Sequence, residues 1–157
     1  MSWDIALSEM ESGDYAACVV LLIREDVLEV VRGRFPFETL KAKIMELKQR
    51  YQVSTLLIED SPISVGLIQS LRERSINVTT YKPDTDKLAR LIAQSDLFAG
   101  GSVRLPKHAP WLEEFVAELL AFPSRHDDQV DALTQGLAWG RRQRGREMRI
   151  GTHIGLC

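Results

Sequence analysis

Residues 16–24 have the sequence AACVVLLIR, an apolar and β-branched run that continues without a polar interruption until its last residue. Such a run is typical of a strand buried on both faces, because a strand with one solvated face alternates apolar and polar residues. The stretch therefore predicts a sheet that has other elements packed on both sides.

The segments on either side of this run predict two further strands. Ser2–Leu7 predicts a short strand, and the turn signal Ser12-Gly13-Asp14 separates it from the apolar run. Glu25-Asp26 is expected to form a tight turn, and Val27–Arg34 predicts the partner strand of a hairpin. The chain is therefore expected to begin with a meander of strands.

The rest of the chain alternates helical and extended patterns. Pro36 suits the first turn of a helix, and Leu40, Ile44 and Leu47 give Phe37–Tyr51 the spacing of an amphipathic helix. The elements expected after it are strand Thr55–Glu59, helix Ile63–Arg74, strand Val78–Tyr81, a helix capped by Asp84 or Thr85 and running to about Ser95, strand Val103–Leu105, a helix from Pro110 to near Phe122-Pro123, and a last helix from about Asp127 to about Arg144. This order predicts an α/β fold with a mixed sheet and helices on both faces.

Length and composition indicate one globular domain. The chain has 157 residues, of which 45% are hydrophobic and 27% charged, and no apolar run approaches the roughly 20 residues that cross a bilayer. The N-terminus lacks the basic start and apolar stretch of a signal peptide, so we expect a cytoplasmic protein. We expect the domain to cover residues 1–145 and a loosely ordered tail to cover residues 146–157.

Charge and cysteine content narrow the classes of function. The net charge of −2 does not by itself indicate a nucleic-acid binder. Cys18 and Cys157 form neither a CxxC motif nor a cluster with histidine, which argues against a zinc site. Five arginines lie close together near the C-terminus, namely Arg141, Arg142, Arg144, Arg146 and Arg149. This run is equally consistent with DNA binding and with a solvated helix end whose charges favour the helix dipole.

Three groups of acidic residues stand out against this background. They are Asp4 in the first predicted strand, Glu59 and Asp60 at the end of a later strand, and Asp127, Asp128 and Asp131 at the start of the last helix. Each group also has an ordinary structural explanation: a solvent-facing sheet edge, a polar turn, and a helix cap favoured by the dipole. Asp131 fits the last explanation least well, because it lies one helical turn beyond Asp128 and beside apolar residues.

Taken together, the three groups predict a metal site. If the strands that carry Asp4 and Glu59 are neighbours, the two side chains meet at the sheet edge where open α/β folds keep their sites. Carboxylates held close together repel one another, so a divalent cation is needed to keep them ionised. Oxygen ligands without a cysteine or histidine cluster favour Mg²⁺ or Mn²⁺. Two such ions about 3.5–4 Å apart are the arrangement used for in-line phosphodiester cleavage.

Several stretches also carry a resemblance to a known family. They are Ser2-Trp3-Asp4, 13–18 (GDYAAC), 57–60 (LIED), Lys82-Pro83-Asp84 with Asp86-Lys87, 109–112 (APWL), and Phe122-Pro123 followed by 126–132 (HDDQVDA). In order and spacing they resemble the C-terminal nuclease domain of the large terminase subunit of tailed phages and prophages, over residues 2 to about 139. The resemblance implies a ribonuclease H-like fold related to Holliday-junction resolvases. The predicted order of elements fits this fold, although other α/β folds fit it too.

The resemblance further implies an activity, partners and a set of site residues. The implied activity is a Mg²⁺- or Mn²⁺-dependent endonuclease, with two ions, that cuts concatemeric double-stranded DNA at the start and end of packaging. The implied partners are the DNA, a packaging ATPase domain, the portal and the small terminase subunit. The implied catalytic and metal-binding residues are Asp4, Glu59, Asp128 and Asp131, with Asp127 as a further metal ligand and Asp60 without an assigned role. The chain contains no GxxxxGK[ST] motif, so ATP-driven translocation is not attributed to it.

DNA contacts are expected from basic residues near the acids, because lysine and arginine neutralise phosphates. The candidates are Lys82, Lys87, Arg90 and Arg125, with Arg104 and Lys107 as further ones, and each is as consistent with ordinary surface charge. His126 is a candidate for a supporting role, whereas Trp111 and Trp139 are expected in the core or an interface. Two other functions fit the same residues: a structure-selective, resolvase-like nuclease, and a catalytically degenerate docking module of the packaging motor.

Overall fold

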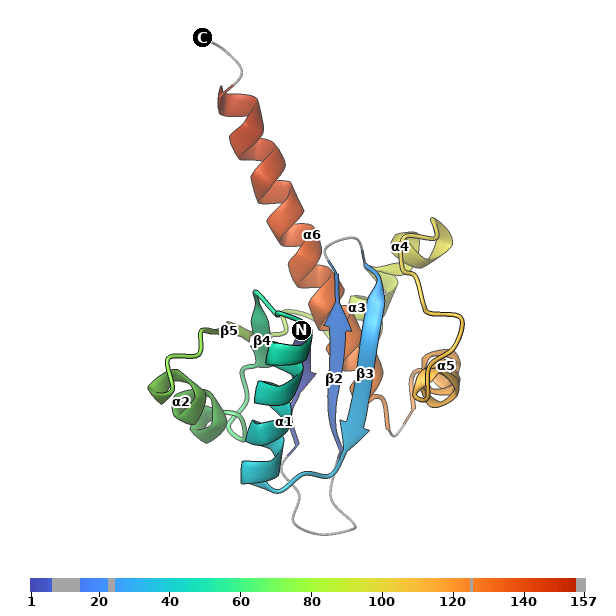
Figure 1. Cartoon of the computed structure of the whole chain (residues 1–157). Coiled ribbons are helices and arrows are strands. Elements are labelled where there is room, and N and C mark those ends of the chain that lie inside the picture. The colour runs from blue at the N-terminus through green and yellow to red at the C-terminus, as the bar shows by residue number, and fades with distance from the viewer. Residues whose placement is uncertain (7–14, 23–24, 125, 155–157) are drawn as a thin grey trace.

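A mixed β-sheet forms the centre of the molecule (Figure 1). The computed structural model describes residues 1–6, 15–22, 25–124 and 126–154, with side chains described as far as residue 145. In these ranges five strands pair in the order β3-β2-β1-β4-β5. Their bounds are β1 Ser2–Asp4, β2 Ala16–Leu21, β3 Val27–Gly33, β4 Leu56–Glu59 and β5 Val78–Tyr81. The predicted α/β architecture with a mixed sheet is confirmed.

The pairing directions place the shortest strand in the middle of the sheet. β1 is antiparallel to β2, with Trp3 opposite Cys18, and parallel to β4, with Trp3 opposite Ile58. β2 pairs antiparallel with β3, and β4 pairs parallel with β5. Because β1 has a partner on both sides, Asp4 lies at the end of an internal strand and not on a frayed sheet edge.

One face of the sheet is covered by helices α1 (Phe37–Arg50) and α2 (Val65–Glu73). Side chains of β2 alternate between the two faces: Ala16, Cys18 and Val20 point into this first core. They pack there with Leu40, Ile44 and Leu47 of α1 and with Leu67 and Leu71 of α2. The predicted amphipathic face of α1 is therefore confirmed as a core face.

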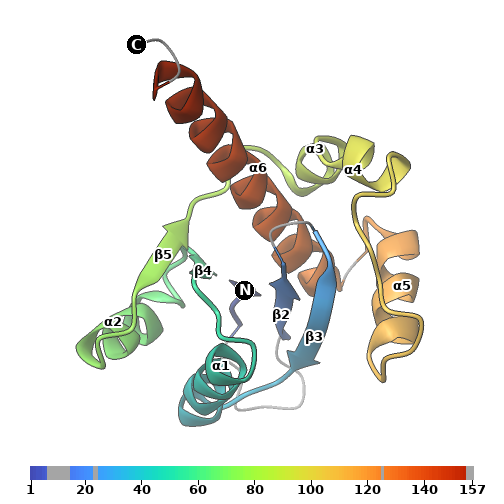
Figure 2. The same cartoon turned by 45° about the horizontal axis from the view of Figure 1, so that its top comes forward.

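The other face is covered by helices α5 (Leu112–Ala121) and α6 (Asp128–Ile154). Figure 2 shows that α6 crosses this face and continues well past the sheet. The crossing is close at Gly136, where a Cβ atom would lie only 2.6 Å from Leu21 and 3.3 Å from Ser2. The preceding residue, Gln135, donates a hydrogen bond of 3.3 Å to the Trp3 carbonyl. These two contacts hold the start of α6 against β1.

After β5, three predicted elements differ from the observed ones. The helix expected from Asp84 to Ser95 is split into α3 (Lys87–Ile92) and α4 (Ser95–Ala99), and Asp86 caps α3 by accepting a hydrogen bond of 2.9 Å from the Ala89 amide. The strand expected at Val103–Leu105 is reduced to an isolated bridge between Arg104 and Asp26.

The last helix is longer than expected, because α6 runs to Ile154 and passes through the predicted boundary between residues 145 and 146. The three residues after it lie outside the described part of the chain. None of the helices in the described part is long and apolar enough to cross a bilayer.

Candidate active site

The carboxyl ends of two neighbouring parallel strands carry the first two predicted site residues. Trp3 of β1 lies opposite Ile58 of β4, so the next residues along the two strands, Asp4 and Glu59, emerge at the same edge of the sheet. Ser64, which is fully buried, donates a hydrogen bond of 2.7 Å to the Glu59 carbonyl and fixes the backbone at this point. The neighbouring acid, Asp60, is exposed.

The start of α6 brings the third acidic group to this edge. The Asp127 carbonyl accepts the first hydrogen bond of the helix, 2.9 Å from the Asp131 amide. The pKa of Asp4 is raised to about 8, mainly by burial and then by the negative charges of Glu59, Asp131 and Asp128 in that order. Since Asp4 is influenced by all three carboxylates, acids from β1, β4 and α6 share one electrostatic environment.

Three of these acids lack an ion-pair partner among the residues that the structure describes. None of the salt bridges between described residues involves Asp4, Glu59 or Asp128, which we call the open half of the site. Burial is the main cause that raises the pKa of Glu59 and that of Asp128. Oδ2 of Asp128 is buried and has no hydrogen-bond partner among the described residues. A buried carboxylate oxygen without a partner is costly, and a bound cation would remove that cost.

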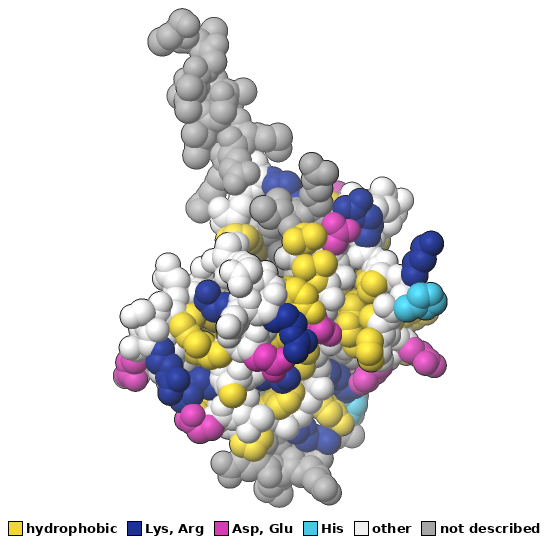
Figure 3. Space-filling model, viewed as in Figure 1, with side chains coloured by type: hydrophobic (Ala, Val, Ile, Leu, Met, Phe, Trp, Pro, Cys, Tyr) yellow, Lys and Arg dark blue, Asp and Glu magenta, His cyan; other side chains and the backbone are white. Residues whose placement is uncertain are grey.

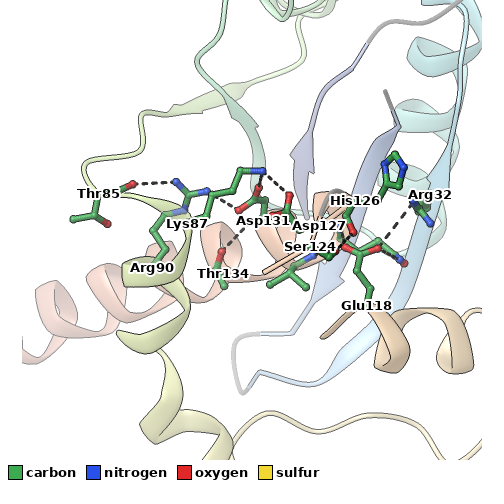
Figure 4. A network of polar contacts seen from close by, with 12 residues as sticks. Arg32, Thr85, Lys87, Arg90, Glu118, Ser124, His126, Asp127, Asp131 and Thr134 are labelled. Carbon is green, nitrogen blue, oxygen red and sulfur yellow. Dashed lines mark hydrogen bonds and ion pairs between the residues drawn. The ribbon is translucent and has the colours of Figure 1, made fainter. Parts of the chain in front are cut away.

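The other two acids are neutralised by side chains of α3, and Figure 4 shows this network. Nζ of Lys87 lies 2.5 Å from Oδ1 of Asp127 and 2.6 Å from Oδ2 of Asp131. Nη2 of Arg90 lies 2.6 Å from Oδ1 of Asp131, and its Nη1 donates a hydrogen bond of 3.1 Å to the Thr85 carbonyl. We call Asp127, Asp131, Lys87 and Arg90 the paired half of the site.

The donor set fits a hard divalent cation, although the acids do not form a ready-made cage. Among the described residues, no three acidic, histidine or cysteine side chains form a group that could hold a metal ion. The paired half explains part of this, because Lys87 and Arg90 hold the Asp131 carboxylate on both oxygens. The open half presents only carboxylate oxygens, the ligand type that Mg²⁺ and Mn²⁺ prefer, and one of them is the unpartnered Asp128 Oδ2.

A cluster around Tyr15 lies beside the open half and was not predicted from the sequence. The guanidinium carbons of Arg32 and Arg34 lie 3.9 Å and 4.0 Å from the centre of the Tyr15 ring, and His126 meets that ring edge-on. Burial raises the pKa of Asp128, and the positive charge of Arg32 partly opposes this rise. The sequence feature that could have revealed this cluster is the spacing of Arg32 and Arg34, because alternate residues lie on the same side of an extended chain.

Glu118 of α5 was also missed, and it caps the acidic helix from a neighbouring element. Its Oε1 accepts hydrogen bonds from the backbone amides of Gln129 (2.7 Å) and Val130 (3.1 Å). On the same helix, Glu114 accepts a hydrogen bond of 2.5 Å from Nη1 of Arg32. No short sequence pattern could reveal this cap, because the donor helix and the acceptor belong to different elements.

The structure places the predicted DNA-contact residues in different settings. Lys82 is exposed, whereas Arg90 is only 8% exposed and faces Asp131, so its guanidinium is not presented to solvent. Arg104 forms a two-contact ion pair with Asp26 at 2.6 Å and 2.8 Å. Arg125 lies outside the described residues. On the face shown in Figure 3, basic and acidic side chains are interspersed and do not gather into one basic patch.

Three of the C-terminal arginines form ion pairs with the body of the domain. Arg141 pairs with Asp96 at 2.7 Å, Arg142 with Asp84 at 2.9 Å, and Arg144 with Glu25. The side chains of Arg146 and Arg149 lie outside the described part. Trp111 is partly buried and packs beside Phe115 in the core between the sheet and helices α5 and α6, as expected.

The sheet order, the long crossing helix and the acids at the carboxyl ends of β1 and β4 define a ribonuclease H-like nuclease fold. The family model described as the terminase RNaseH-like domain matches residues 1–138, and the chain belongs to that family. Domains of this class generally use divalent metal ions. No curated protein and no solved structure gives a significant match.

Proposed function

We propose that this chain is the metal-dependent endonuclease domain of a phage DNA-packaging terminase and that it cuts concatemeric double-stranded DNA. The observation that carries the proposal is the open half of the site, in which three acids from β1, β4 and α6 have no ion-pair partner within the described part of the chain. Such an arrangement is unfavourable in the metal-free protein and becomes favourable when a divalent cation binds.

The residues of this chain have distinct proposed roles. Asp4, Glu59 and Asp128 hold Mg²⁺ or Mn²⁺, while Asp131 and Asp127 complete the site on the side of α6. Two bound ions would supply the charge that activates the attacking water and stabilises the leaving 3′ oxygen. The chain's own contribution is to hold its carboxylates on a rigid strand pair and helix start, so that their geometry does not depend on a mobile loop.

The DNA is proposed to lie over the open half, with phosphates contacted by Lys82 and by the arginines beside Tyr15. The interspersed surface charge supports weak binding by this domain alone. A packaging ATPase domain, the portal and the small terminase subunit are the proposed partners that keep the domain on DNA in the host cytoplasm.

One observation favours a second candidate function. Lys87 and Arg90 already neutralise Asp131, as expected of a catalytically degenerate domain that serves only as a docking module. A docking module needs no metal, so its melting temperature would not respond to Mn²⁺.

The proposal is tested by incubating the purified domain with supercoiled plasmid in Mn²⁺. We expect nicked and linear products from the wild type and none from Asp4→Asn. The matched control is Asp60→Asn, because Asp60 is an exposed acid next to the site and should be dispensable. Cleavage that survives Asp4→Asn would reject the site, and a wild type that neither cleaves DNA nor responds to Mn²⁺ would favour the docking module.

A further inference from the structure

Lys87 occupies an unusual position for a lysine that begins a surface helix. Its ammonium bridges two carboxylates at 2.5 Å and 2.6 Å, and those side chains, Asp127 and Asp131, are only 8% and 4% exposed. The lysine side chain itself is 51% exposed. Lys87 therefore reaches from solvent into a buried acidic position.

The two basic residues of the paired half are held very differently. Arg90 is buried, and its guanidinium is fixed by Asp131 and by the Thr85 carbonyl. Lys87 has a flexible stem, and among the described residues its ammonium contacts the carboxylates of Asp127 and Asp131. Removing the Lys87 ammonium would leave Asp131 still anchored by Arg90, but would free Asp127 and one oxygen of Asp131.

Asp4 connects the two halves electrostatically. Its carboxyl group is influenced by Asp131 and Asp128, and Lys87 acts in the opposite direction by favouring its ionised form. The Lys87 ammonium, which contacts acids of the paired half, therefore also favours the ionised form of Asp4 from a distance.

We propose that Lys87 is a tethered cation that competes with a divalent metal ion for the carboxylates of Asp127 and Asp131. This inference rests on the proposed metal-dependent function and makes it more specific. Binding at the open half needs no displacement, whereas an ion that uses Asp127 or Asp131 must first displace the ammonium. The site is thus kept partly neutral without metal, and full occupancy requires Lys87 to swing into solvent.

The test is calorimetric titration of Mn²⁺ into the wild type, Lys87→Met and the control Lys82→Met, without DNA. If Lys87 occupies the acids about nine-tenths of the time, its removal tightens Mn²⁺ binding about tenfold or adds a second ion. Lys87→Met should also melt at a lower temperature than the wild type in EDTA, because buried acids lose their partner. Lys82 is an exposed lysine in the segment before α3, so the variant Lys82→Met should match the wild type in both measurements.

The outcomes separate this inference from the proposed function. Unchanged or weaker Mn²⁺ binding by Lys87→Met, with normal binding by the wild type, would overturn the competition and leave Lys87 a structural residue. Absence of Mn²⁺ binding in all three proteins would overturn the proposed function as well. Binding by Lys87→Met alone would support the competition in its strongest form.

A second measurement uses the wild-type protein and does not depend on a variant that folds. The ammonium resonance of Lys87 should be protected from solvent exchange in EDTA, because it is bound to two buried carboxylates. Titration with Mg²⁺ should remove that protection while the resonance of Lys82 stays unchanged. Protection that persists at saturating Mg²⁺ would show that the ion and the ammonium do not compete.

Discussion

The two halves of the acidic site bury similar side chains at the same sheet edge, yet their electrostatics are opposite. In the paired half, Asp127 and Asp131 face Lys87 and Arg90 at 2.5–2.6 Å. In the open half, the described residues provide no ion pair to Asp4, Glu59 or Asp128, and burial raises the pKa of each. The difference teaches that the position of an acid in a fold does not decide its availability to a ligand. Cations on neighbouring elements decide it.

The largest expected difference between the halves concerns cleavage. Asp128→Asn removes a carboxylate of the open half, and we expect a loss on the order of 10³-fold in Mn²⁺-dependent cleavage, which corresponds to several kcal/mol of transition-state stabilisation. Asp127→Asn removes an acid that Lys87 already neutralises, and we expect a loss of only about 10-fold. Initial rates of plasmid nicking measure both, and equal losses would abolish the distinction.

The next largest effect concerns the buried ion pair of the paired half. Arg90→Leu leaves Asp131 buried with Lys87 as its remaining ion-pair partner among the described residues, so we expect unfolding free energy to fall by about 3 kcal/mol. Urea denaturation in EDTA measures it. The control is Arg141→Leu, which breaks an exposed pair with Asp96 and should change stability very little. A similar loss in both variants would show that the Arg90 pair is not special.

The pH dependence of stability should distinguish the open half. The pKa of Asp4 is raised from about 3.9 in the unfolded chain to about 8 in the folded domain. Folding therefore favours the protonated form of Asp4. The contribution of Asp4 to the free energy of unfolding is complete below about pH 4 and is lost as pH rises through 8. The charged groups that act on Asp4 are Glu59, Asp131 and Asp128, which raise its pKa, and Lys87, which lowers it.

We expect the metal-free wild type to lose on the order of 3 kcal/mol of unfolding free energy between pH 5 and pH 8 relative to Asp4→Asn. Denaturation at the two pH values in EDTA measures this, and Asp60→Asn should behave as the wild type. Mn²⁺ binding at pH 7 should release on the order of one proton per domain, seen by calorimetry in two buffers. Parallel pH profiles for wild type and Asp4→Asn would contradict the assignment.

The smallest expected effect concerns DNA binding beside the open half. Arg34→Ala should weaken duplex binding severalfold and reduce the salt slope by about 1, because one phosphate contact is lost. Arg104→Ala is the control, since its partner Asp26 directly precedes β3 and therefore lies at the opposite end of that strand. Anisotropy titrations at several salt concentrations would detect the difference. An equal effect of both substitutions would place the DNA elsewhere.

Much of the fold could be predicted from local patterns. The uninterrupted run at residues 16–24 predicted a strand buried on both faces, and β2 is buried in this way but ends at Leu21, before the half-exposed Leu22. The spacing of Leu40, Ile44 and Leu47 predicted the core face of α1. The errors fell where tertiary contacts outweigh local pattern, at the split of the helix after Asp84 and at Val103–Leu105, which only bridges Asp26.

The sequence alone determined where acids follow strands and where they begin a helix, because a run of apolar residues and its polar end are local properties. That placement brought Asp4 and Glu59 to one edge once β1 and β4 paired in parallel. Only the tertiary structure decided that Lys87 and Arg90 neutralise Asp131, since these residues lie about 40 positions away along the chain. Ion pairs of this kind depend on how separate helices pack, and no periodicity within either helix encodes them.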